Sequence, residues 1–248
     1  MRWKFILGLL TTCAVLMSMS YTMLIPFLPM YLIQDLGVVK ADVDMWSGAI
    51  FAITFLVSGI MAPIWGALAD KKSRKLMALR AGFCLAITYF LGGLVTNPWE
   101  LLGVRFIQGL SAGLWPALLA IISVESPKLK LGFCLGVMQG GMTAGGVLGP
   151  LFGGLLADQF GMRMAFFIAA AALFLITLAL LFFVKEEPRK PDPNAKPVKI
   201  WDFSLCKIPA VKRMLICAGV VQLTILMQQP IMPLYVALKF CVSRSSLF

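Results

Sequence analysis

Seven long apolar runs dominate the chain, and each carries charge only near its ends or not at all. One bilayer crossing needs about 20 apolar residues, so each run is long enough for a transmembrane helix. With 60% hydrophobic and 13% charged residues, the chain is far more apolar than a soluble domain. The sequence therefore predicts an all-α membrane protein with transmembrane helices at residues 5–33, 45–69, 76–95, 101–124, 131–157, 164–184 and 215–238.

The connectors divide these helices into two groups. Those between the first six runs have roughly 5 to 11 residues, which favours antiparallel neighbours in one bundle. The next connector is rich in proline and charge, which is typical of a linker. We predict a six-helix transmembrane bundle at residues 1–184, a cytoplasmic linker at 185–214, a seventh transmembrane helix at 215–238 and an atypical tail at 239–248.

A weak internal repeat favours the same division. Residues 26–31 and 230–235 both read PxxPxY, which makes the first and seventh helices equivalents. Parallel repeats of six-helix halves are one recognised transporter architecture. The two prolines, Pro26 and Pro29, also predict a bend near the outer end of the first helix.

The distribution of basic residues predicts the orientation. Seventeen of the 22 lysines and arginines fall on the side of the amino terminus, four on the other side, and Arg105 lies within a helix. Basic residues gather in cytoplasmic loops, so we expect a multi-pass protein of the cell membrane with a cytoplasmic amino terminus. This orientation disfavours a heptahelical receptor, whose amino terminus would face outward.

The residue types exclude several classes of function. The chain contains no histidine, which removes histidine-ligated zinc sites and the Ser-His and Cys-His catalytic pairs. Its six cysteines are scattered without a CxxC pair and are interpreted as packing residues. The net charge of +11 is explained by the membrane-flanking loops rather than by nucleic acid. We therefore expect neither an enzyme nor a metal, cofactor or nucleic-acid partner.

The loop between the second and third helices has the sequence GALADKKSRK, residues 66–75. Asp70 lies at the carboxyl end of the second helix, where its charge meets the negative end of the helix dipole. The carboxylate therefore requires a basic partner, which Arg74 or another cation can supply. The alternative interpretation is a basic loop that only sets the topology.

Arg105 interrupts the fourth apolar run. An arginine in a transmembrane helix costs about 2.5 to 3.5 kcal/mol at mid-membrane, so it is a functional candidate by default. The alternative is that its side chain extends to the outer interface near Glu100.

The fifth helix contains glycines spaced four residues apart, at positions 141, 145, 149 and 153. This spacing forms a stripe along one face and favours close helix contact. The stripe is interpreted as a packing surface, a hinge, or both. Pro150 and Gly154 complete the pattern GxxxGPxxGG, which a generic GxxxG contact does not explain.

Together, in this order, these motifs resemble those of the major facilitator superfamily, and GxxxGPxxGG resembles the signature of its drug:proton antiporters. The resemblance implies a gating loop at Gly66, Asp70 and Arg74, a proton-coupling role for Arg105, and an antiporter motif at Gly145, Gly149, Pro150, Gly153 and Gly154. Ser73 stands where the family usually has glycine, and it would strain the turn if a left-handed residue were needed.

The family resemblance implies a secondary active transporter that exports lipophilic drugs in exchange for protons. In that resemblance the first, second, fourth and fifth helices line a central cavity. From the expected facing of their helices, the candidate lining residues are Met23, Tyr31, Phe55, Met138 and Gln139. Asp35 and Glu100 are candidate proton carriers, and a carrier in another part of the protein is the third possibility.

The family has twelve helices, so we expect a truncated chain whose partner would be the missing carboxyl-terminal half. Two alternatives stay open: a secondary transporter of another small solute such as a sugar or an amino acid, and a non-transporting membrane fragment.

Overall fold

The computed structural model describes residues 2–71, 73–184, 209 and 211–224. The chain divides into two units, residues 1–198 and 199–248. In the second unit, residues 211–224 are helical. The rest of the predicted seventh helix, the tail, and all of the predicted linker except residues 209 and 211–214 lie outside the described residues, so those predictions stand as such.

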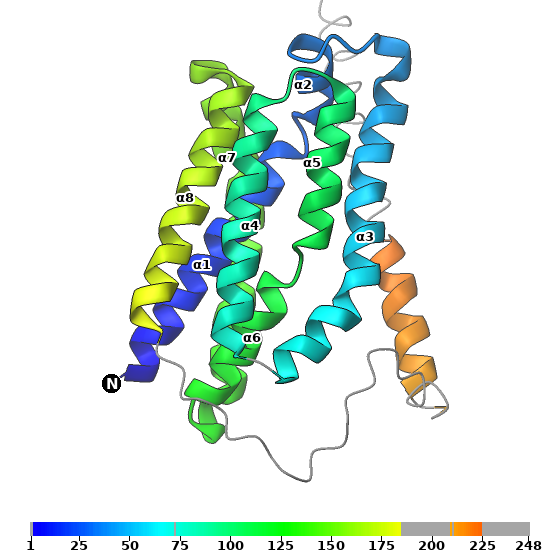
Figure 1. The fold of residues 1–248 in the computed structure, drawn as a ribbon. Coiled ribbons are helices and arrows are strands. Elements are labelled where there is room, and N and C mark those ends of the chain that lie inside the picture. The colour runs from blue at the N-terminus through cyan, green and yellow to red at the C-terminus, as the bar shows by residue number, and fades with distance from the viewer. Residues whose placement is uncertain (1, 72, 185–208, 210, 225–248) are drawn as a thin grey trace, which may run out of the picture. The chain divides into compact units, whose positions relative to one another are not determined.

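The described part of the first unit is all-α, which confirms the predicted fold class (Figure 1). Within the part of the chain that the structure describes, six segments are long and apolar enough to cross a membrane, in agreement with the first six predicted spans. The helices are α1 (Arg2–Leu24), α2 (Leu28–Gln34), α3 (Val43–Lys71), α4 (Arg74–Leu94), α5 (Pro98–Leu110), α6 (Leu114–Glu125), α7 (Leu131–Phe160) and α8 (Met162–Phe183), with 3₁₀ turns at Lys40–Asp42 and Lys128–Lys130.

The first apolar run is two helices rather than one. The chain turns at residues 25–27 between α1 and α2, next to the two prolines that predict a bend. Proline lacks the N–H that would continue the helical ladder, so Pro29 is tolerated in the first turn of α2. The predicted bend is therefore confirmed, as a complete break.

The fourth apolar run is one span, as predicted, but it consists of two helices instead of the single helix expected at residues 101–124. α5 ends at Leu110 and α6 begins at Leu114. Gly113 has a φ of 120°, which a residue with a side chain rarely adopts. Pro116, in the first turn of α6, has no N–H to donate back to residue 112. These two residues explain why the helical ladder is interrupted here.

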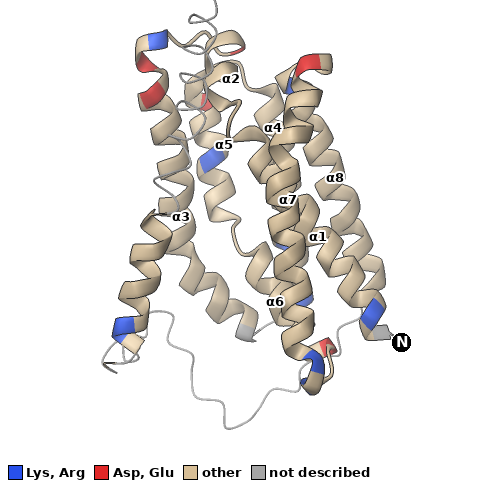
Figure 2. Cartoon of the chain, turned by 180° about the vertical axis from the view of Figure 1, so that it is seen from behind, with Lys and Arg blue, Asp and Glu red and all other residues tan. Residues whose placement is uncertain are grey.

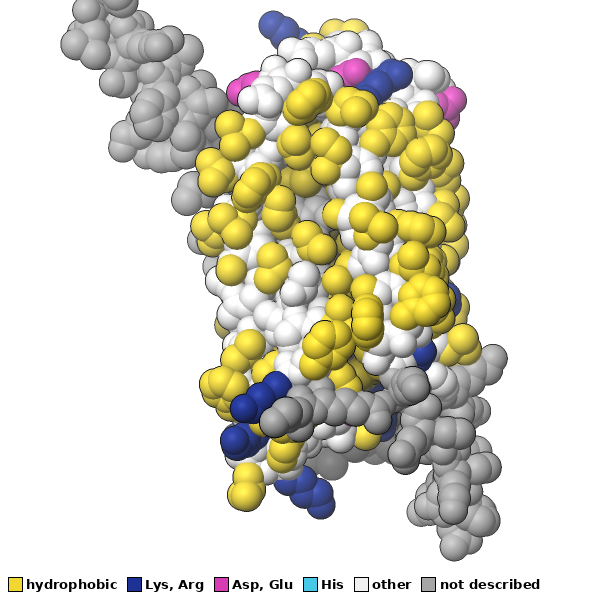
Figure 3. All heavy atoms as spheres, turned by 90° about the vertical axis from the view of Figure 1, so that its left-hand side faces the viewer, with side chains coloured by type: hydrophobic (Ala, Val, Ile, Leu, Met, Phe, Trp, Pro, Cys, Tyr) yellow, Lys and Arg dark blue, Asp and Glu magenta, His cyan; other side chains and the backbone are white. Residues whose placement is uncertain are grey.

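The helices pack mainly in three pairs: α1 with α7, α4 with α8, and α3 with α5. Among the described residues of the bundle, most charged residues lie near its two ends, and the acidic ones lie mostly at the end opposite the amino terminus (Figure 2). Between the ends, apolar side chains cover the face formed by α1, α7 and α8 (Figure 3). This distribution fits a bundle immersed in a bilayer.

Candidate functional site

The loop between α3 and α4 has a regular geometry. Ser73 is the N-cap of α4: its φ is −71°, and its side chain accepts a hydrogen bond from the Leu76 N–H at 3.0 Å. The turn therefore needs no left-handed residue here, and serine replaces glycine without strain. Gly66 lies in α3 and Arg74 begins α4. The side chain of Asp70 lies outside the described part, so the Asp70–Arg74 latch stays a prediction.

Arg105 is buried in α5, with 6% of its surface exposed. Its Nη1 donates a hydrogen bond to Oε1 of Gln108 at 2.9 Å. Glu100 instead accepts hydrogen bonds from Thr96 and Asn97 at the start of α5. Among the described residues, no carboxylate lies within ion-pair distance of Arg105. The expected alternative, an arginine extending to Glu100 at the interface, is therefore wrong.

The glycine stripe of α7 faces α1. A methyl group added at Gly145 would meet the backbone of Val15, and one added at Gly149 would meet the Met19 carbonyl oxygen at 2.8 Å. Gly153 lies equally close to the Met23 backbone. The stripe is thus a surface where two helix backbones approach closely.

The other two residues of the antiporter motif lie beside this contact rather than in it. Pro150 is on the exposed side of α7. Gly154 meets only the ring end of Phe27, at 3.3 Å from an added methyl group. The motif therefore has a clear packing role at Gly145, Gly149 and Gly153.

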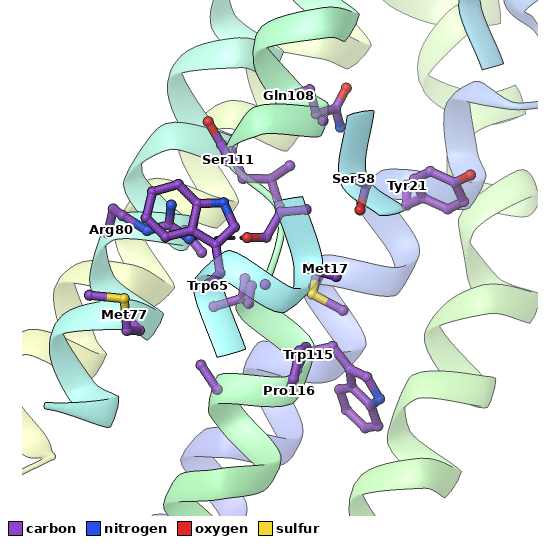
Figure 4. A pocket seen from close by; sticks show the side chains of 18 of the residues that line it. Met17, Tyr21, Ser58, Trp65, Met77, Arg80, Gln108, Ser111, Trp115 and Pro116 are labelled. Atoms are coloured by element: carbon purple, nitrogen blue, oxygen red, sulfur yellow. Dashed lines mark hydrogen bonds between the residues drawn. The ribbon is translucent and has the colours of Figure 1, made fainter. Parts of the chain in front are cut away.

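A cavity of about 750 Å³ lies in the bundle, lined mainly by α1, α3, α4 and α6 together with the α5–α6 break (Figure 4). Its wall is mostly apolar and aromatic, with a few polar groups. A volume of this size suits a small organic molecule. The lining side chains include Met17, Tyr21, Phe55, Ser58, Trp65, Met77, Arg80, Gln108, Trp115 and Met142.

Of the five residues predicted to line a cavity, Phe55 lines this one. Met23, Tyr31 and Met138 are almost completely buried in the packed core, so for this cavity their prediction is wrong. Tyr31 lies beyond the α1–α2 break, where its hydroxyl donates to the Gly92 carbonyl oxygen at 2.9 Å. Gln139 is on the exposed side of α7. The predicted orientation of these side chains toward a cavity is wrong because the environment of a side chain depends on which neighbour its helix packs against.

The cavity wall contains a connected polar group formed by Trp65 and Arg80. Neither residue belongs to the sequence motifs. The Arg80 guanidinium stacks 3.4 Å from the centroid of the Trp65 ring (Figure 4). Trp65 Nε1 donates to the Leu110 carbonyl oxygen at 2.8 Å, and Arg80 Nη2 donates to that of Ala112 at 3.0 Å. One sequence feature could have indicated this group: Arg80 is a charged residue inside the third apolar run.

The candidate proton carriers lie away from this cavity. Asp35 forms an ion pair with Arg163, with 3.3 Å between Oδ1 and Nε, between the end of α2 and the start of α8. Glu100 caps α5 through Thr96 and Asn97. Neither residue lines the cavity. In the described ranges, no three acidic or cysteine side chains cluster in a way that could hold a metal ion.

A multi-span helical bundle around an apolar, ligand-sized cavity is the architecture of a membrane transporter. The family model of the Major Facilitator Superfamily matches residues 10–247, and the chain belongs to that superfamily. The resemblance carried by the three motifs is thereby confirmed. The described residues accordingly belong to a multi-pass membrane protein of this superfamily.

The chain is similar to curated proteins named Multidrug resistance protein MdtG. It is 39% identical to the protein from Citrobacter koseri over 186 residues, which cover 75% of this chain and 46% of that protein. It is 37% identical to the protein from Yersinia enterocolitica over 187 residues, which cover 75% and 45%. The chain thus spans about half the length of the curated relatives that it matches.

Solved structures share the fold. A bacterial homologue of the lysosomal transporter Spinster, in an inward-facing state, aligns with a TM-score of 0.65 and 22% identity over 83% of this chain and 48% of that chain. The human organic anion transporter MFSD10 aligns with a TM-score of 0.59 and 21% identity over 72% and 47%. At these identities the likeness concerns the fold alone.

Proposed function

We propose that this chain forms the amino-terminal part of a transporter of the cell membrane that exports lipophilic compounds in exchange for protons. The observation that carries the proposal is the cavity of about 750 Å³, whose wall is mainly apolar and aromatic. The names of its multidrug resistance relatives support the same substrate class.

The wall is suited to substrates of varied shape. Met17, Met77 and Met142 line the cavity with flexible thioether chains that repack around different ligands. Phe55 and Trp115 add flat apolar surface. Polar groups are few, so shape and apolar burial would dominate binding.

A second helical unit would complete this wall. The spans of α3 and α7 are the least buried of the six, and α3 presents large apolar side chains outward, including Leu56 and Ile60. The curated relatives are about twice as long as the matched segment. We infer that these faces pack against a further set of helices, as in transporters built from two parallel halves.

The roles of the charged residues follow from this proposal. Arg105 is the proton-coupling residue, and Gln108 links it to the cavity because it binds Arg105 and also lines the wall. Asp70 and Arg74 form the gating latch at the cytoplasmic end, and the amino terminus is cytoplasmic.

Two measurements test the proposal. In inverted membrane vesicles that carry this chain within the full-length transporter, an imposed proton gradient should drive uptake of ethidium or of anilinonaphthalene sulfonate, and a protonophore should abolish it. The same chain in lipid nanodiscs should bind one of these dyes, and Phe55→Ala should weaken binding, whereas Phe182→Ala on exposed α8 should not.

Three results would count against parts of the proposal. Gradient-driven uptake of a sugar or an amino acid into cells would favour another solute. Binding without any transport would favour a non-transporting membrane protein. Retained dye transport in Asp70→Asn would overturn the latch while leaving the cavity assignment intact.

A further inference from the structure

The break between α5 and α6 leaves backbone carbonyls without their helical donors. In an uninterrupted helix the Leu110 carbonyl would accept from residue 114 and the Ala112 carbonyl from residue 116. Residue 116 is proline and has no N–H, so the Ala112 carbonyl has no backbone donor at that position. In a membrane, where water is scarce, an unsatisfied backbone carbonyl is costly.

Side chains from two other helices supply the missing donors. Trp65 of α3 donates to the Leu110 carbonyl at 2.8 Å, and Arg80 of α4 donates to the Ala112 carbonyl at 3.0 Å. The stacking of Arg80 on Trp65, 3.4 Å from the ring centroid, holds the two donors side by side.

The position of Arg80 inside the bundle indicates that this side chain has a structural role. Its side chain lies within the α4 span, and among the described residues no carboxylate forms an ion pair with it. Its Nε is buried without a hydrogen-bond partner in the described part. A charge inside a transmembrane helix is expensive and is typically retained for a role.

We propose that Trp65 and Arg80 are positioning residues that hold the α5–α6 segment in its broken form and thereby shape the cavity wall at residues 111–116. We call this pair the clamp. Its two side chains, which come from α3 and α4, supply the hydrogen-bond donors that the Leu110 and Ala112 carbonyls lack in the broken backbone. Gly113 permits the arrangement, because its φ of 120° is one that residues with a side chain rarely adopt.

Hydrogen exchange of the full chain in lipid nanodiscs tests the proposal without any ligand, so its outcome is independent of the proposed function. The reporters are the amides of Ser111, Ala112 and Ala117, which donate to Ile107, Gly109 and Gly113 around the break.

Trp65→Phe keeps the aromatic ring but removes the donor, and Arg80→Met keeps an unbranched chain but removes charge and donors. Each should raise exchange at these amides about tenfold, because each removes the donor of one carbonyl at the break. Arg80→Met removes a charge from the membrane, so membrane insertion is not at risk.

Matched controls use the same substitutions elsewhere. Trp99→Phe changes a tryptophan that is 71% exposed, and Arg163→Met removes an arginine near the opposite end of the bundle. Neither should change exchange at the three reporter amides.

A conservative variant separates the clamp from a general packing role. Arg80→Lys keeps a positive charge and an N–H donor on a long side chain, so exchange at the reporter amides should stay closer to that of the parent chain than in Arg80→Met. Trp65→Phe, by contrast, leaves no donor for the Leu110 carbonyl. Unchanged exchange in both Trp65→Phe and Arg80→Met, or equal exchange in Arg80→Lys and Arg80→Met, would overturn the proposal.

Discussion

Arg105 and Gln108 lie one turn apart on α5, and Nη1 of the arginine donates to Oε1 of the glutamine at 2.9 Å. Both side chains are buried, and Gln108 also lines the cavity. The arginine charge is thus stabilised within the bundle by a neutral side chain rather than by a carboxylate. Gln108 therefore connects the buried arginine to the cavity wall.

Gln108→Leu should destabilise the bundle by about 1.5 to 3 kcal/mol, because it removes a hydrogen bond from a buried charge. Thermal unfolding of the full chain in detergent measures the change. Gln139→Leu is the matched control, since Gln139 is on the exposed side of α7 and should have little effect. Equal shifts in the two variants would contradict a stabilising role for the Arg105–Gln108 pair.

Gly149→Ala should destabilise the bundle by about 1 to 3 kcal/mol, because the added methyl group meets the Met19 carbonyl oxygen at 2.8 Å and the backbones of α1 and α7 must separate. Gly140→Ala, on the same helix, meets nothing within 4 Å. It should be neutral or slightly stabilising, since alanine favours helix more than glycine does. Comparable unfolding temperatures for the two variants would show that the α1–α7 approach is not tight.

Asp35→Asn should lower stability by about 1 kcal/mol or less, because the Asp35 and Arg163 side chains are 27% and 43% exposed and solvent screens their attraction. The difference from the parent chain should shrink further as salt is raised. Unfolding at low and high ionic strength measures both effects.

The same variant tests Asp35 as the proton carrier. If Asp35→Asn abolishes proton-driven dye transport while the protein stays folded, Asp35 is the proton carrier. If transport persists, Asp35 is excluded.

Ser73→Ala should cost about 1 kcal/mol, because the hydroxyl oxygen caps the first turn of α4 by accepting from the Leu76 N–H. Ser73→Gly, which restores the residue usual in the family, should cost only a few tenths of a kcal/mol. The unfolding temperatures of the two variants decide the point. A larger loss for glycine than for alanine would mean that the cap is not what serine provides.

Local sequence patterns were sufficient for the spans and the family. Long apolar runs predict membrane helices because a helix pairs its backbone polar groups within its own segment, where the bilayer offers no water to bind them. The four-residue spacing of Gly145, Gly149 and Gly153 predicts a close helix contact because it depends on one helix alone. The family motifs lie in short segments, so they can be identified without knowledge of packing.

Residues whose role depends on a neighbouring helix could not be identified in this way. Arg80 was counted among the basic residues of the amino-terminal side, yet it stacks on Trp65, which is 15 residues earlier and on another helix. Likewise, Met23 and Met138 were assigned to a cavity but are packed in the core. The direction in which a helical side chain points is local, but what lies there is decided by the other helices.

The sequence by itself therefore determined the all-α membrane fold, its first six spans, the glycine stripe and the superfamily, since all of these follow from composition and spacing within single segments. Only the tertiary structure decided the break at residues 111–113 and the wall of the cavity. The reason is that a broken helix persists in a membrane only where other helices satisfy its carbonyls, as Trp65 and Arg80 do for Leu110 and Ala112.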